Sequence, residues 1–106
     1  MTDQRNEKID IACLALGRLI AAQCPPGFEK AVMALDLHQG RSLVRIVATQ
    51  ENGWEAQVPL SEEPVQNMLE TLRTIQKEMA EQDPRPWKGC TVTLRKGGHF
   101  DLDVTY

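Results

Sequence analysis

The sequence predicts an α+β protein: an antiparallel sheet of about five strands with two helices packed on one face, in the order α-β-β-β-α-β-β. Two stretches repeat apolar residues at steps of three and four, as amphipathic helices do. Five shorter runs alternate apolar and polar residues or are rich in β-branched residues, and turn residues separate them. An antiparallel sheet that is apolar on one face needs covering on that face only, which two helices can provide.

The first helix is expected to run from a cap at Thr2 or Asp3 to about Cys24, where Pro25-Pro26-Gly27 ends it. Its apolar stripe comprises Ile9, Cys13, Leu16, Ile20 and Cys24, widened by Ala12 and Leu19. Gly17 lies inside the stripe and lowers helix stability, so we expect a close backbone contact there.

Three strands should follow as an antiparallel meander. Residues 28–37 alternate loosely, with Ala31, Met33, Leu35 and Leu37 on one face and Phe28, Lys30, Val32 and Asp36 on the other. A turn at residues 38–41 leads to a β-branched run at 43–49. Asn52-Gly53 is a hairpin signal, after which Trp54, Ala56, Val58 and Leu60 alternate with polar residues or proline.

The second helix should begin at Ser61 with a capping hydroxyl and the acidic residues Glu62 and Glu63 in its first turn. Its stripe comprises Val65, Met68, Leu69, Leu72, Ile75 and Met79. Residues 83–86 break it, and a final hairpin joins strands at 90–95 and 100–106 through a turn at 96–99.

Length and charge limit the function. The 106 residues suit a single domain spanning 1–106, and 12 Lys plus Arg against 15 Asp plus Glu give a net charge of −3. Nucleic-acid binders normally carry a basic excess, so a basic protein is the expected partner, with no nucleic acid. The first ten residues do not resemble a secretion signal, and charges interrupt the apolar stretch 9–22, so a cytoplasmic protein without membrane contact is expected.

Residues suited to catalysis or metal binding are sparse. Cys13, Cys24 and Cys90 form no Cys-x-x-Cys pair and should be free thiols, and His38 and His99 fall in expected turns without ligand spacing. Cys90 could be a nucleophile with His99 and Asp101, but it alternates with the apolar set and fits a core thiol better. We therefore expect a binding protein rather than an enzyme, with no cofactor and no metal.

Charged residues on the expected sheet surface and at the second helix start are candidates for binding a partner. Asp101 and Asp103 are two positions apart on one strand and so share a face. The full candidate set is Glu55, Glu62, Glu63, Arg95, Asp101 and Asp103.

The C-terminal stretch carries a motif beyond periodicity. Pro86-Trp87, Thr93-Leu94 and the run from Gly98 to Tyr106 together resemble the closing signature of the YezG-like family of antitoxin, or immunity, proteins. The order of elements is compatible across nearly the whole chain. Trp87, Gly98, Phe100 and Tyr106 are the matched residues, and they fit structural roles in a packed hairpin.

This resemblance implies an intracellular α+β protein that neutralises a toxin, often a nuclease, of a contact-dependent or polymorphic toxin system in bacterial competition. It would act as a monomer or weak homodimer, without turnover, by covering the toxin's active site or substrate surface. A type III secretion chaperone that binds an effector is the alternative, because such chaperones are also small, acidic and similar in element order.

Overall fold

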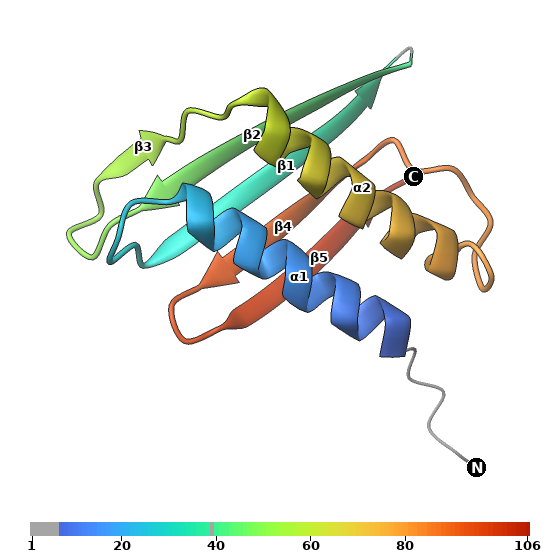
Figure 1. Ribbon diagram of the computed structural model, residues 1–106, viewed down its shortest axis with the longest axis horizontal. Coiled ribbons are helices and arrows are strands. Elements are labelled where there is room, and N and C mark those ends of the chain that lie inside the picture. The colour runs from blue at the N-terminus through green and yellow to red at the C-terminus, as the bar shows by residue number, and fades with distance from the viewer. Residues whose placement is uncertain (1–6, 39) are drawn as a thin grey trace.

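The predicted fold is confirmed by the computed structural model, which describes residues 7–38 and 40–106. Two helices and five strands follow in the expected order (Figure 1). The helices are α1 (Glu7–Gln23) and α2 (Glu62–Met79). The strands are β1 (Lys30–His38), β2 (Arg41–Thr49), β3 (Glu55–Gln57), β4 (Gly89–Arg95) and β5 (His99–Thr105).

The strands form one antiparallel sheet in the order β3-β2-β1-β4-β5. The central strand β1 pairs with β2 along Lys30–Thr49 to His38–Arg41 and with β4 along Lys30–Arg95 to Asp36–Gly89. The first three strands are a meander, whereas the C-terminal hairpin joins on the far side of β1. Strands β3 and β5 are therefore the two edges of the sheet.

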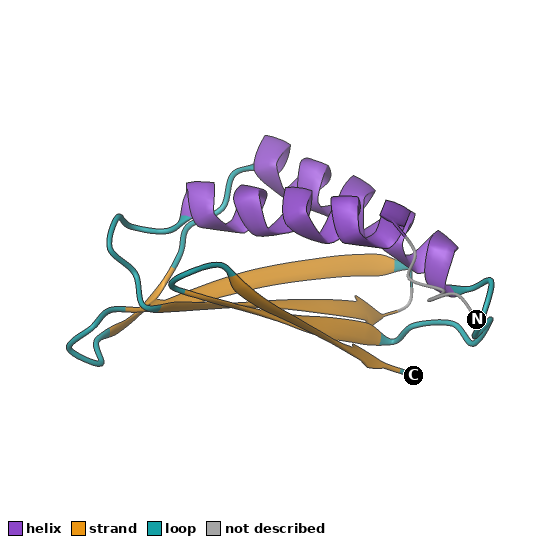
Figure 2. Cartoon of the chain, turned by 90° about the horizontal axis from the view of Figure 1, so that it is seen from below, coloured by secondary structure: helices purple, strands orange, loops and turns teal. Residues whose placement is uncertain are grey.

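Both helices lie side by side on one face of the sheet, and the described chain leaves the other face uncovered (Figure 2). The largest fully buried side chains are Leu16 and Ile20 of α1, Met68 and Ile75 of α2, and Met33, Ile46 and Val92 of the sheet. They come from the helical stripes, the alternating sets and the β-branched run of the sequence, and the core lies between the two layers. No helix in residues 7–38 and 40–106 is long and apolar enough to cross a membrane.

The ends of several elements differ from the expectation. Thr2 and Asp3, the expected caps of α1, lie outside the described residues. Ser61 is at the N-cap position of α2, but its side chain makes no capping hydrogen bond. His38 ends β1 and His99 begins β5, so the strands extend into both expected turns.

Two aromatic residues lie outside the strands whose alternation included them. Phe28 precedes β1 and packs against the core instead of sharing the face of Lys30 and Asp36, because alternation does not hold outside the strand. Strand β3 is only three residues long, and Trp54 lies between the turn and this strand, with 69% of its surface exposed. The turn itself is as expected: the Gly53 amide donates to the Gln50 carbonyl at 2.9 Å.

Candidate functional site

The C-terminal hairpin brings three of the six predicted binding residues together. Arg95 ends β4, and Asp101 and Asp103 of β5 pair with Thr93 and Thr91. All three charged side chains are exposed on the uncovered sheet face. Within the described chain neither aspartate forms an ion pair. The edge strand thus presents two free carboxylates on one face, about 7 Å apart at their backbones.

The other three predicted residues lie elsewhere. Glu55 is on β3 and Asp101 is on β5, at opposite edges of the sheet. Four strand spacings of roughly 4.8 Å put these two strands about 19 Å apart. Glu62 and Glu63 begin α2 and therefore belong to the helical layer, where they complement the positive end of the helix. The six residues do not form one surface, and only the hairpin group is contiguous.

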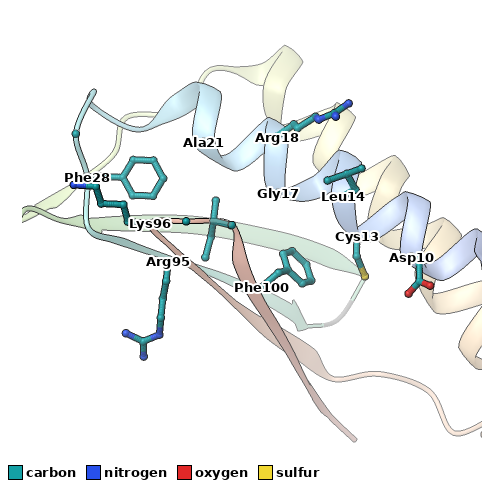
Figure 3. Close-up of a pocket in the computed structure, with 14 residues that line it drawn as sticks. Asp10, Cys13, Leu14, Gly17, Arg18, Ala21, Phe28, Arg95, Lys96 and Phe100 are labelled. Carbon is teal, nitrogen blue, oxygen red and sulfur yellow. The ribbon is translucent and has the colours of Figure 1, made fainter. Parts of the chain in front are cut away.

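A groove that the sequence did not predict lies beside this hairpin. It occupies about 750 Å³ between α1 and the β4–β5 turn (Figure 3). The rings of Phe28 and Phe100 lie under α1 in this groove, whereas the Arg95 side chain points away from it (Figure 3). The lining residues from α1 are Asp10, Cys13, Leu14, Gly17, Arg18 and Ala21.

Two local features shape the groove. A side chain at Gly17 would begin 3.6 Å from the Phe100 ring and 3.8 Å from Leu94, so the missing side chain leaves space in the wall of the groove. At its end, the Lys96 amide donates to the Glu29 carbonyl at 2.9 Å and ties the hairpin turn to the segment that carries Phe28. The glycine within an apolar helical stripe was the one sequence signal of this groove.

The hairpin turn also contacts the β2–β3 turn through an exposed ion pair. Lys96 Nζ lies 3.1 Å from Glu51 Oε1. The neighbouring Glu51 carboxylate raises the pKa of Lys96, chiefly through this hydrogen bond. Gly97 and Gly98, with φ of 94° and 90°, supply the left-handed backbone that this tight turn needs.

The three cysteines are free thiols, as the sequence predicted. Cys90 is buried in the core, and burial raises its pKa to about 11. Burial also raises the pKa of Cys24 and, with a smaller contribution from Asp10, that of Cys13. All three thiols are therefore protonated at neutral pH.

The possible catalytic group of Cys90, His99 and Asp101 does not converge. Cys90 pairs with Val104 on the helix-covered side, whereas His99 pairs with Arg95 at the other end of the hairpin. His99 and Asp101 face the opposite side of the sheet from Cys90. In the described part of the chain, no group of three or more His, Cys, Asp or Glu residues could hold a metal ion.

The residues that match the immunity-protein motif occupy the core and the turns. Trp87 is buried just before β4, and Phe100 and Tyr106 pack against the core from β5 and the residue after it. The Arg85 guanidinium stacks 4.1 Å from the Tyr106 ring centroid and also binds Asp83. These contacts hold the segment before β4 to the end of β5.

The sequence matches no protein-family model, and a search of curated proteins finds no match either.

Proposed function

We propose that this chain is an immunity protein that binds and neutralises a cognate bacterial toxin, a nuclease in the simplest case. The observation that carries the proposal is that two exposed carboxylates and a largely apolar groove lie at the same edge of the sheet, the carboxylates on its uncovered face and the groove on its helix face. Asp101 and Asp103 offer charge to a basic partner, and the groove with Phe28 and Phe100 offers apolar contact area.

Each part of this surface has a separate role in binding. Nucleases hold a phosphate backbone and therefore carry basic clefts, which exposed carboxylates can engage in place of nucleic acid. Complementary charge speeds association, whereas burial of apolar side chains in a pocket provides most of the affinity. The resemblance of the C-terminal motif to antitoxins supplies the class of partner, and a basic toxin agrees with the net charge of −3.

The test is to mix the purified protein with the toxin encoded beside its gene, and to measure complex formation and toxin activity. We expect a stoichiometric complex and loss of activity. The double variant Asp101→Lys/Asp103→Lys should bind at least about a hundredfold more weakly, because like charges placed opposite one another cost several kcal/mol. The matched control, Glu62→Lys/Glu63→Lys, changes the charge equally on the helical layer and should stay within about threefold of the wild type.

Failure of the wild-type protein to bind or inhibit that toxin would refute the proposal. If both double variants lose the same affinity, the proposal of neutralisation stands, but the β5 edge is not the binding site.

A further inference from the structure

Strand β5 is paired on one side only. Within the described chain its ladder joins it to β4, and no strand lies on its outer side. In an antiparallel pair, alternate residues of an edge strand point their N–H and C=O groups away from the sheet. Alternate residues of His99–Thr105 therefore present a row of backbone donors and acceptors to which another extended chain can pair.

The side chains of β5 disfavour a second copy of the same strand as that chain. An antiparallel β5–β5 pair centred on Leu102 would set Asp101 opposite Asp103 of the other copy, in both directions. Moving the centre of this pair to Asp101 or to Asp103, a change of register by two residues, sets two copies of that aspartate opposite each other. Like charges directly across a strand pair are destabilising, so the edge disfavours self-pairing.

The two faces of β5 require different chemistry from an added strand. On the uncovered face, the residues opposite Asp101 and Asp103 would have Cβ atoms about 5 Å from theirs, within reach of a lysine or arginine. On the helix face, the half-buried Phe100, Leu102 and Val104 pack against the apolar core, so an added strand would need apolar side chains on that face. Phe100 lies in the groove under α1 (Figure 3), so the side chain opposite Phe100 would lie beside that cavity.

We propose that the free edge of β5 receives one extended segment of the partner, in which basic and apolar side chains alternate. The basic side chains pair with Asp101 and Asp103, and the apolar one opposite Phe100 enters the groove between α1 and the hairpin. This inference deepens the proposed function, because the toxin would supply the segment, but the chemistry of the edge can be tested without the toxin.

The probe is a pair of capped peptides of four lysines and four valines, one strictly alternating and one with the lysines and valines in blocks. Both carry the same charge, so general attraction to an acidic protein is matched. In a titration followed by amide NMR, we expect the alternating peptide to bind at least about tenfold more tightly, a difference of about 1.4 kcal/mol. Its binding should shift and protect the amides of residues 99–105.

Two pairs of variants separate the groove from the charges. Leu14→Lys places a charge at the wall of the groove, whereas Ile11→Lys makes the same change one helical turn earlier, beside the α1–α2 furrow. Both side chains are more than half exposed, so neither change should prevent folding. Leu14→Lys should lower the affinity for the alternating peptide at least about tenfold, and Ile11→Lys should lower it less than about twofold. Asp101→Asn/Asp103→Asn should also lower the affinity for the alternating peptide, and Glu62→Gln/Glu63→Gln should not.

Equal affinity for the two peptides, or shifts that avoid residues 99–105, would overturn the inference. If the toxin is neutralised but amide exchange at β5 is unchanged in the complex, the inference fails and the proposed function stands. If the alternating peptide pairs with β5 but the toxin is not bound, the proposed function fails and the chemistry of the edge stands.

Discussion

Gly89 and Gly17 differ in the space available for a side chain. At Gly89, an added Cβ would collide with the carbonyl oxygen of Leu35, because β4 passes close to β1 at this point. At Gly17, the nearest atoms would be at ordinary van der Waals distance. The expected close backbone contact at Gly17 is therefore wrong: a methyl group fits, and the glycine keeps the groove wide instead.

Alanine substitutions test this difference. Gly89→Ala should lower the free energy of unfolding by about 1–3 kcal/mol, because the strand must shift to relieve the collision. Gly17→Ala should raise the free energy of unfolding by up to about 1 kcal/mol, because alanine favours the helix. The added methyl group should also narrow the groove and weaken binding of a partner there. Urea unfolding of both variants, with partner binding by Gly17→Ala, provides the measurements; a destabilised Gly17→Ala protein would contradict this account.

At the scale of elements, the spacing of apolar residues predicts which face of each helix or strand is buried. The stripe of α2 fixed its buried face: Met68, Leu72 and Ile75 are all in the core. Alternation fixed the two faces of β4 and β5 and so placed Asp101 and Asp103 together. The same rule extended β3 too far, because the pattern continues through Trp54 and Leu60 although the ladder pairs only Glu55–Gln57.

The groove could not be predicted in this way, because it depends on contacts between distant segments. It needs α1 to cross beside the C-terminal hairpin, and so depends on β4 joining the sheet beside β1 rather than β3. No pattern within either segment encodes that order. Leu14 and Phe100 each look like ordinary apolar residues of their own element until the topology brings them to one cavity.

The two tryptophans differ in burial and should therefore differ in their contribution to stability. Trp54→Ala should change the free energy of unfolding by less than about 0.5 kcal/mol, because this ring is mostly exposed beside the turn. Trp87→Ala should lower it by about 3–5 kcal/mol, because that ring is buried between the layers. Urea unfolding followed by circular dichroism compares the two without relying on their fluorescence. Comparable losses would mean that Trp54 packs into the core after all.

At the scale of the whole molecule, two features meet at the β5 edge of the sheet. The helices cover one face of the sheet and leave the other face exposed (Figure 2). Asp101 and Asp103 lie on that exposed face, at the β5 edge. The groove opens between the helical layer and the hairpin, next to that charged edge. A partner approaching β5 therefore meets the exposed carboxylates and the groove as neighbours, so the two can act at different stages of one encounter.

This arrangement predicts that charge sets the association rate and the groove sets the dissociation rate. Because exposed charges act over about 10 Å at 0.1 M salt, the association rate with a basic toxin should fall about tenfold or more between 0.02 M and 0.5 M salt. Asp101→Asn/Asp103→Asn should lower that rate and flatten its salt dependence. Gly17→Ala, which narrows the groove without changing charge, should leave association nearly unchanged and speed dissociation. Stopped-flow mixing and surface-binding kinetics separate the two rates, and a groove variant that slowed only association would contradict this division.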